Sequence, residues 1–336
     1  MINQNLKTLK ASNSDRGAVL ITVLLIVAVM AAVAVALVDD IRFGIRRASN
    51  ISSTTQANWY ALGSEALALS VIDQTSQLSA DKTTLEQPWA TNRGIFPIDG
   101  GSIATQLADG SNCFNVNSLV EKNERSEYIA NVDARKQFRT LLEANGVSDS
   151  ESETISGAIT DWIDSDSRPV PRGAEDFDYT GGNPAYRPPN HLISDITELR
   201  AIKGIDLETY TVLKPLLCAL PNTNLSEINI NTLTPDQASL ITMIVGKALK
   251  ADTVATVLGN RPASGFDTLE AFWSSKEFED IDIDQSVRDQ VKEKTAFFTL
   301  TTTVIYGDAY VTMTSLISAG GDGNAYIVSR QFGEEI

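Results

Sequence analysis

The sequence contains a single histidine, His191, and two cysteines among its 336 residues. A histidine-based catalytic triad or a zinc centre needs partner residues, and the chain has no GxSxG, HExxH or P-loop motif to provide them. The two cysteines form no CxxC pair for zinc and are too few for a disulfide-rich scaffold. These absences predict a protein that is not an enzyme.

Positive charge is also scarce. The chain has 27 lysines and arginines against 43 aspartates and glutamates, so its net charge is -16 at pH 7. Phosphate backbones repel such a chain, and we therefore exclude nucleic acid as a partner. Clustered carboxylates favour divalent cations instead.

One long apolar run stands out, from residue 18 to residue 38, and Thr22 is its only polar residue. As a helix at ~1.5 Å per residue, the run spans a hydrocarbon core of ~30 Å. A removable secretory signal has a shorter apolar core that ends at small residues, and Ala34 and Ala36 resemble such a cleavage site. The run therefore predicts either a retained anchor or a cleaved signal, and its length favours the anchor.

The remaining pattern predicts an α+β fold. Helical spacing continues to about residue 74, through Ala57, Tyr60, Ala61, Leu67, Ala68 and Val71. Short strands are expected between residues 88 and 114. A final hairpin is expected in "FFTLTTTVIYGDAYVTMTSLIS", turning at Gly307-Asp308, with a third strand in "AYIVSRQF". These strands must pair with the early ones or leave open edges, so the region between them is predicted to be an insertion into one sheet.

The intervening region has a helical pattern. The stretch "DARKQFRTLLEANG" ends at Asn145-Gly146, which is typical of a helix C-terminus. In the next stretch, "SESETISGAITDWID", Ser150 and Glu153 have the spacing of a capping box. A second helical set begins at Thr234-Pro235, after the strand-like "SEININ".

Acidic residues are most closely spaced in the stretch "DWIDSDSRPVPRGAEDFDY". Its carboxylates are Asp161, Asp164, Asp166, Glu175, Asp176 and Asp178. The stretch is not an EF-hand. Arg168 stands where an EF-hand loop has its next ligand, and Pro169 stands where it usually has the turn glycine. Two interpretations stay open, a solvated acidic loop or a calcium site. Cys113 and Cys218, at the two ends of the first helical block, likewise form either a disulfide or two buried free thiols.

The start of the chain resembles a known signal. Arg16-Gly17, after a short basic leader and before the apolar run, is similar to the class III signal of type IV pilins and type II secretion pseudopilins. The resemblance implies that prepilin peptidase cuts between Gly17 and Ala18, and that Ala18 is then N-methylated. Most of these proteins have Glu as the fifth mature residue, where this chain has Thr22.

That departure, together with "DITELRAIKGID", "ININ" and "RPASGFDTLEAFW", resembles the GspK minor pseudopilins of type II secretion. In pseudopilins the Glu is thought to pair with the N-terminal ammonium of a neighbour, so a tip subunit has no need of it. The resemblance implies a pilin-like long helix on an antiparallel sheet, interrupted by a large helical domain of two SAM-like modules. The implied segments are a cleaved leader 1–17, a transmembrane part 18–38, a stem and first strands 39–112, an inserted domain 113–290 with modules at about 132–220 and 231–290, and final strands 291–336.

The resemblance also implies a function. It predicts a minor pseudopilin at the pseudopilus tip that nucleates or caps assembly for export of folded proteins across the outer membrane. The expected partners are GspI, GspJ, the inner-membrane assembly platform and prepilin peptidase. The expected location is the inner membrane, single pass, with a cytoplasmic N-terminus and a periplasmic head. The alternative is a membrane-anchored periplasmic binding module of a related pilus system.

Two site predictions follow from the same resemblance. The acidic stretch is expected to bind structural calcium through Asp164, Asp166, Glu175 and Asp178. An oxidising periplasm is expected to favour the bridge between Cys113 and Cys218.

Overall fold

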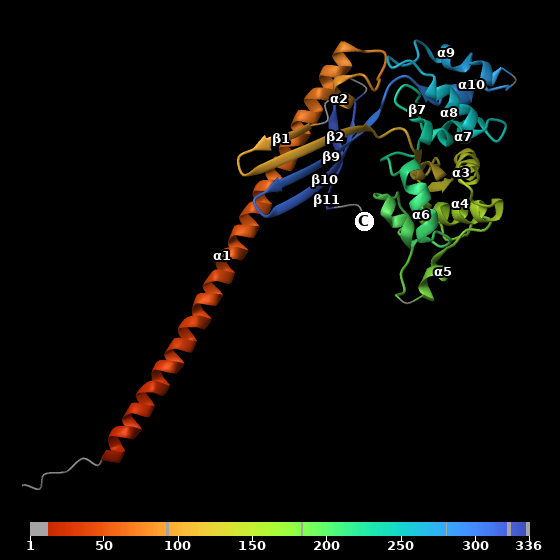
Figure 1. Ribbon diagram of the computed structural model, residues 1–336. Coiled ribbons are helices and arrows are strands. Elements are labelled where there is room, and N and C mark those ends of the chain that lie inside the picture. Colours follow the sequence, from red (N-terminus) through yellow and green to blue (C-terminus); the bar gives the residue numbers. More distant parts are fainter. Residues whose placement is uncertain (1–12, 92–93, 183, 280, 321–323, 334–336) are drawn as a thin grey trace, which may run out of the picture.

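The computed structural model describes residues 13–91, 94–182, 184–279, 281–320 and 324–333, and side chains from Gly17 onward. It shows a long helix that crosses an antiparallel sheet, with a compact helical region beside the sheet (Figure 1). The first twelve residues of the expected leader lie outside the described part of the chain. The α+β fold class expected from the sequence is confirmed.

Helix α1 runs without interruption from Asn13 to Leu78, as its proline-free sequence predicts. At ~1.5 Å per residue its 66 residues extend over about 100 Å. Within the described residues, this is the one helix long and apolar enough to cross a membrane. Its most apolar window has a mean hydropathy of 3.1, and none of that window is buried in the protein. The helix is therefore consistent with a membrane anchor.

The second half of α1 packs on the sheet through small side chains. Ala57, Ala61 and Ala68 are buried, as predicted, and Ile72 continues their stripe. Leu67, which belongs to the predicted helical spacing, is 53% exposed and lies outside this buried stripe. Because alanines let backbones approach closely, α1 lies directly on the alternate buried residues of the central strands.

The sheet has five strands in the order β1-β2-β9-β10-β11. Strands β1 and β2 (Gly94–Ile98 and Gly101–Asp109) precede the helical region, and β9, β10 and β11 (Phe297–Tyr306, Ala309–Ser318 and Tyr326–Phe332) follow it. Strands β2 and β9 pair antiparallel, with Leu107 opposite Leu300. The predicted insertion into one sheet and the predicted final hairpin are therefore confirmed.

The helical region contains short helices and two-residue or three-residue strands. Its first part holds β3 (Phe114–Asn115), η1 (Val116–Leu119), β4 (Val120–Lys122), β5 (Tyr128–Ala130), α3 (Val132–Ala144), α4 (Asp149–Ile163), α5 (Asp176–Thr180), η2 (Ile196–Ala201), α6 (Leu207–Leu213), η3 (Lys214–Leu216) and β6 (Leu217–Cys218). Its second part holds β7 (Ile228–Asn229), η4 (Pro235–Gln237), α7 (Ser239–Val245), α8 (Ala251–Gly259), α9 (Leu269–Trp273), η5 (Lys276–Phe278), α10 (Gln285–Arg288) and β8 (Val291–Lys292). Helix α2 (Pro88–Thr91) lies outside this region, against α1 and β2.

The two parts repeat one local design. Asn115 accepts a hydrogen bond from the backbone N–H of Asn117, and Asn229 accepts one from that of Asn231. The second asparagine of each pair then accepts a backbone N–H from a distant segment, at Ile193 in the first part and at Phe266 in the second. A parallel strand pair closes each part, β3 with β6 and β7 with β8.

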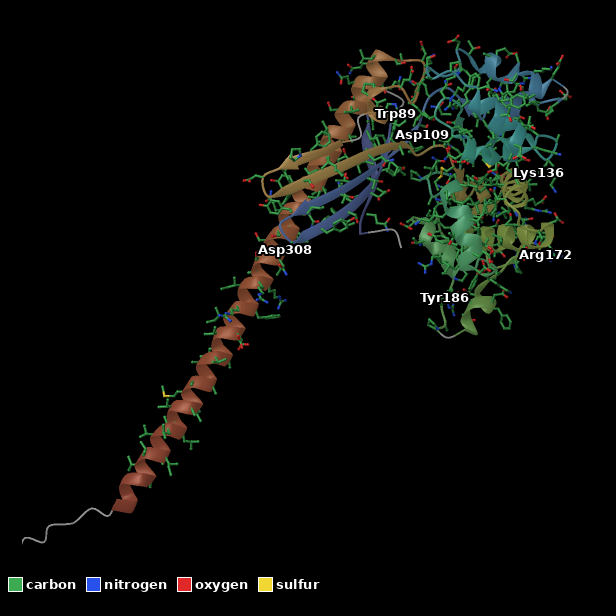
Figure 2. The ribbon with its side chains drawn as sticks, viewed as in Figure 1. Trp89, Asp109, Lys136, Arg172, Tyr186 and Asp308 are labelled. Atoms are coloured by element: carbon green, nitrogen blue, oxygen red, sulfur yellow. A yellow bond between two sulfur atoms is a disulfide. The ribbon has the colours of Figure 1, made fainter. Side chains whose placement is uncertain are left out.

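A buried polar junction joins the helical region to the sheet. Asp109, at the end of β2, accepts hydrogen bonds from the Ser111 N–H at 2.7 Å, from the Thr232 hydroxyl at 2.5 Å, and from the Thr295 hydroxyl. Burial raises the pKa of Asp109 even though these hydrogen bonds lower it. Figure 2 shows Asp109 between the sheet and the helical region, where it ties the entry and return segments together.

The start of α4 differs from the prediction by two residues. Ser148, rather than Ser150, is the N-cap, and it forms a capping box with Glu151. Ser150 lies in the first turn, where its hydroxyl accepts a hydrogen bond from Arg172. Both serines have a glutamate three residues later, so local spacing alone does not separate them.

This difference gives a matched test. Ser148→Ala is expected to lower the free energy of unfolding by ~1 kcal/mol, because it leaves the backbone N–H of Glu151 without its acceptor. Ser150→Ala is expected to change it by less than ~0.5 kcal/mol. Urea unfolding of the two variants measures the difference. Equal losses, or a larger loss for Ser150→Ala, would contradict the assigned cap.

Candidate functional site

Three carboxylates converge between α4 and α5. Asp164, Asp166 and Glu175 each place one oxygen within 4.8 Å of the others. Asp164 is the C-cap residue directly after α4, and Glu175 is the N-cap residue directly before α5. The intervening loop turns back on itself, so two helix ends hold the carboxylates together.

Two of these carboxylates are withdrawn from solvent. Asp164 and Glu175 are 3% and 6% exposed, while Asp166 is exposed. One oxygen of Asp164 and one of Glu175 are buried with no hydrogen-bond donor among the described residues. Burial, followed by repulsion from Asp161, Asp166 and Glu175, raises the pKa of Asp164 to about 7. Burial also raises the pKa of Glu175.

The oxygens fit a divalent cation. Ca²⁺ binds oxygen at ~2.3–2.6 Å, so ligands on opposite sides of one ion lie about 4.8 Å apart. A bound cation would satisfy the undonated oxygens and cancel the repulsion among the carboxylates. Three side chains supply only part of a calcium shell of ~6–8 oxygens, and backbone carbonyls and water commonly supply the rest.

Asp178, the fourth predicted ligand, is not brought into this group. One of its oxygens pairs with the Lys203 ammonium at 2.6 Å, and the other accepts the backbone N–H of Glu175 at 3.1 Å. Both contacts stabilise its charge, and the pKa of Asp178 is lowered, chiefly by the hydrogen bond from Lys203. Asp178 therefore helps to hold the backbone of Glu175 in place without joining the group of three carboxylates.

Asp161 is a buried carboxylate beside the cluster, and its charge acts on Asp164. It is fully buried one helical turn before Asp164, and it accepts the backbone N–H of Val170 at 3.0 Å. Its other oxygen has no donor among the described residues and lies against Gly173, where an added Cβ would be 1.8 Å away. Burial, partly offset by the Val170 N–H, raises the pKa of Asp161 to about 7. The three-residue spacing from Asp164 was the available sign that both lie on one helix face.

An aromatic cluster supports the loop. Trp162 contacts Tyr179 edge-on at 5.4 Å between ring centroids, and Tyr186 lies 5.4 Å from Tyr179. Because Trp162 lies between Asp161 and Asp164 on α4, its indole is a natural reporter for a cation at this site.

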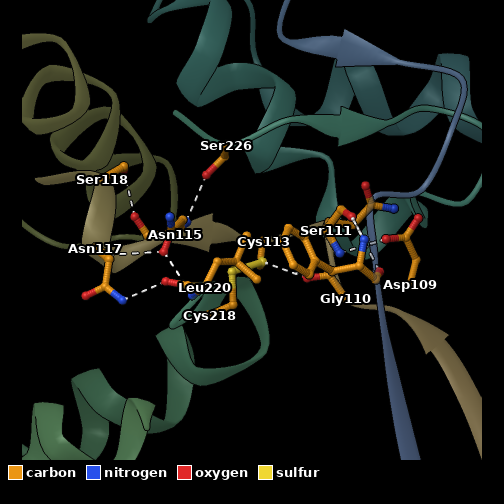
Figure 3. Close-up of a disulfide and its surroundings, with 12 residues drawn as sticks. Asp109, Gly110, Ser111, Cys113, Asn115, Asn117, Ser118, Cys218, Leu220 and Ser226 are labelled. Carbon is orange, nitrogen blue, oxygen red and sulfur yellow. Dashed lines mark hydrogen bonds between the residues drawn. A yellow bond between two sulfur atoms is a disulfide. The ribbon is translucent and has the colours of Figure 1, made fainter. Parts of the chain in front are cut away.

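The cysteines are joined at the base of the first part of the helical region. The Cys113–Cys218 bridge has an S–S distance of 2.00 Å, and its two Cα atoms are 5.7 Å apart. It links β3 to β6, next to the hydrogen bonds of Asn115 and Asn117 (Figure 3). The bridge therefore closes the 105-residue interval that contains the acidic loop.

The expected processing site lies at the start of α1. Gly17 and Ala18 are both helical and exposed. Thr22, the fifth residue after Gly17, donates its hydroxyl to the backbone carbonyl of Val19 at 2.9 Å. Its polar group is therefore satisfied within the helix.

The comparisons with known proteins cover both parts of the helical region. A family model described as "Type II secretion system (T2SS), protein K" matches residues 112–222, and a second model with that description matches residues 228–293. The boundary between the two matches falls where the repeated asparagine design begins again.

Relatives extend the similarity over almost the whole chain. The type II secretion system protein K of Pectobacterium carotovorum subsp. carotovorum is 33% identical over 95% of this chain and 97% of its own. The protein of that name from Klebsiella pneumoniae is 30% identical over 96% and 98%. A chain in the crystal structure of the GspK-GspI-GspJ complex from enterotoxigenic Escherichia coli matches with a TM-score of 0.75 and 29% identity, covering 86% of this chain and all of that one.

Proposed function

The chain belongs to the type II secretion system protein K family of minor pseudopilins, and from this premise we propose that it forms the tip of the pseudopilus. Family membership makes it a structural component rather than an enzyme. At the tip it would nucleate or cap assembly for export of folded proteins across the outer membrane. The observation that carries this proposal is the position of the helical region.

The helical region lies beside the sheet, and its first part reaches back at α5 to the level of the middle of α1 (Figure 1). Its second part, with α7 to α10, lies level with the C-terminal end of α1. In a filament built by stacking α1 helices, that bulk would fill the space of the next subunit. Thr22 supports the same proposal, since a tip subunit has no ammonium above it for a carboxylate at this position to neutralise.

The expected partners follow from the matched complex, which contains GspI and GspJ. We propose the same association here, together with contact to the inner-membrane assembly platform. The apolar helix would hold the chain in the inner membrane, with a cytoplasmic N-terminus and a periplasmic head. The proposed segments are the leader 1–17, the membrane part 18–38, the stem and first strands 39–112, the inserted domain 113–290 and the final strands 291–336.

Processing tests the proposal most directly. Purified from membranes that contain its prepilin peptidase, the protein is expected to have the mass of residues 18–336 plus one methyl group. Intact-mass spectrometry gives the answer in one measurement. A full-length chain, or one cut after residue 38, would refute the pseudopilin mechanism and favour an anchored or secreted binding module.

We propose further that Asp164, Asp166 and Glu175 hold a structural calcium ion. The proposal is supported by their spacing, by the undonated oxygens of two of them, and by the charge that accumulates there without a cation. The ion would join the end of α4 to the start of α5 and fix the loop between them.

Calcium is expected to stabilise the full chain by about 2.7 kcal/mol at a hundredfold excess over its dissociation constant. Thermal unfolding with and without chelator measures this effect. Asp164→Asn is expected to abolish it, and without calcium this variant should be at least as stable as the parent, because it removes repulsion from a buried cluster. Asp176→Asn is the matched control, since Asp176 pairs with Arg187 outside the group.

Terbium provides a second readout of the same site. Excitation of Trp162 should sensitise bound Tb³⁺, and added Ca²⁺ should quench this emission by displacement. Loss of the emission in Asp176→Asn but not in Asp164→Asn would show that the ion lies elsewhere.

A further inference from the structure

Helix α3 carries an arginine side chain, Arg135, whose charge is only partly compensated. None of the residues that the structure describes forms a hydrogen bond or a direct ion pair with its guanidinium, and its Nε is buried. The side chain is only partly exposed, and burial lowers its pKa, while the charges of Asp161 and Glu153 partly offset that effect at longer range. A desolvated guanidinium that no carboxylate contacts directly is costly.

Arg135 lines a groove of about 460 Å³ between α3, the start of α4 and the turn after α7. The charged residues along it are Arg135, Lys136, Arg139, Glu143, Glu153 and Lys247. A second hollow of about 340 Å³ shares Thr140, Glu143 and Lys247 with it and adds one charge of each sign, Lys250 and Asp252. The ion pair between Glu143 and Lys247 therefore lines both hollows.

Most of the other charges in the groove already have partners. Arg139 pairs with Asp149 at 2.9 Å, Lys247 with Glu143 at 2.5 Å, and Arg172 with Glu153 at 2.9 Å. Among the described residues that line the hollow of about 460 Å³, Arg135 and the exposed Lys136 form no direct ion pair, on a chain whose net charge is -16. Figure 2 shows Lys136 and Arg172 on the side of the helical region farthest from α1, where a partner has access.

We propose that this groove binds an acidic segment of a partner protein, with the Arg135 guanidinium taking a carboxylate. The planar fork of arginine matches a carboxylate in a bidentate geometry, and lysines beside it add charge without fixing geometry. Two adjacent positive side chains, Arg135 and Lys136, suit a segment with several carboxylates better than a single small ion. The proposal does not depend on the role in secretion.

The probe is a fluorescein-labelled, N-acetylated and C-amidated hexaglutamate peptide, and the receptor is the full chain in detergent. Fluorescence anisotropy is expected to show binding, although the net charges repel. Arg135→Gln should weaken binding by at least about tenfold, which corresponds to a charge-assisted hydrogen bond. Arg135→Lys should recover part of the loss. Lys294→Gln, which removes an exposed charge beside the sheet, should change binding by less than about twofold.

The same experiment separates binding from a structural role, since the positive charge of Arg135 also acts on buried Asp161. Unchanged peptide affinity in Arg135→Gln, with or without a lower unfolding temperature, would overturn the proposal. If that variant does not fold, Lys136→Gln decides: a loss of about fivefold with a smaller salt dependence supports the groove, and no loss overturns it. Equal binding of hexaglutamine, or displacement by equimolar inorganic phosphate, would also overturn it.

Discussion

Replacing Arg330 by methionine is expected to lower the free energy of unfolding by about 2–3 kcal/mol. Arg330, on edge strand β11, donates to both carboxylate oxygens of Glu65 on α1, and the Ser315 hydroxyl donates to the same group at 2.6 Å. Without Arg330, the Glu65 carboxylate, which is 5% exposed, loses the guanidinium that neutralises it. The loss is smaller than the ~3–5 kcal/mol of a fully buried pair, because 37% of the Arg330 side chain is exposed. Urea unfolding of the full chain measures it.

Two controls test the cause. The double variant Glu65→Leu, Arg330→Met removes both charges and is expected to recover most of the stability. Arg187→Met breaks an exposed pair with Asp176 and should cost less than ~1 kcal/mol. An equal loss from Arg187→Met, or no recovery in the double variant, would contradict the buried-pair explanation.

The pair also predicts a pH dependence. Burial alone would raise the pKa of Glu65, but the hydrogen bonds from Arg330 and Ser315 and the charge of Arg330 outweigh it and lower the pKa below 4.5. The stability that the pair supplies is therefore present above the unfolded-state pKa and is lost as the pH falls through the folded-state value. The difference between the parent chain and Arg330→Met should shrink below about pH 4.

Loss of the disulfide is expected to cost about 2–5 kcal/mol. The bridge closes a 105-residue interval, and in the chain-entropy model a long loop gains most from closure. Cys113→Ser, Cys218→Ser should therefore unfold at lower urea than the parent, with the change reported by Trp162 in the same interval. Cys113 is 7% exposed, so reductant should act on the parent slowly.

The reductant supplies the control. When the parent is reduced, its urea unfolding midpoint should shift toward that of the double variant. The midpoint of the double variant should not change with reductant. A double variant with the parent's unfolding midpoint would show that the buried contacts of β3 and β6 hold this part without the bridge.

Features that depend on neighbouring residues were determined by the sequence. A continuous apolar run without proline specifies the first part of α1, because a helix satisfies its backbone hydrogen bonds internally in an apolar surrounding. The Gly307-Asp308 turn specifies the final hairpin through its short loop. Asn145-Gly146 marks the end of α3, because glycine takes the positive φ of 90° at Gly146 at little cost. Each of these features is decided within a few residues, so a linear pattern contains the information.

Features that depend on distant residues were decided by the tertiary structure. The sequence placed Asp178 among the ligands, but its carboxylate pairs with Lys203 outside the group of Asp164, Asp166 and Glu175. Asp161 is buried beside that group, where the loop folds back onto α4 and the Val170 N–H contacts it. Arg135 forms no direct ion pair among the described residues, because packing leaves Asp161 and Glu153 to act on it only at longer range. Convergence of side chains depends on contacts between segments far apart in the chain, and their spacing along the sequence does not specify those contacts.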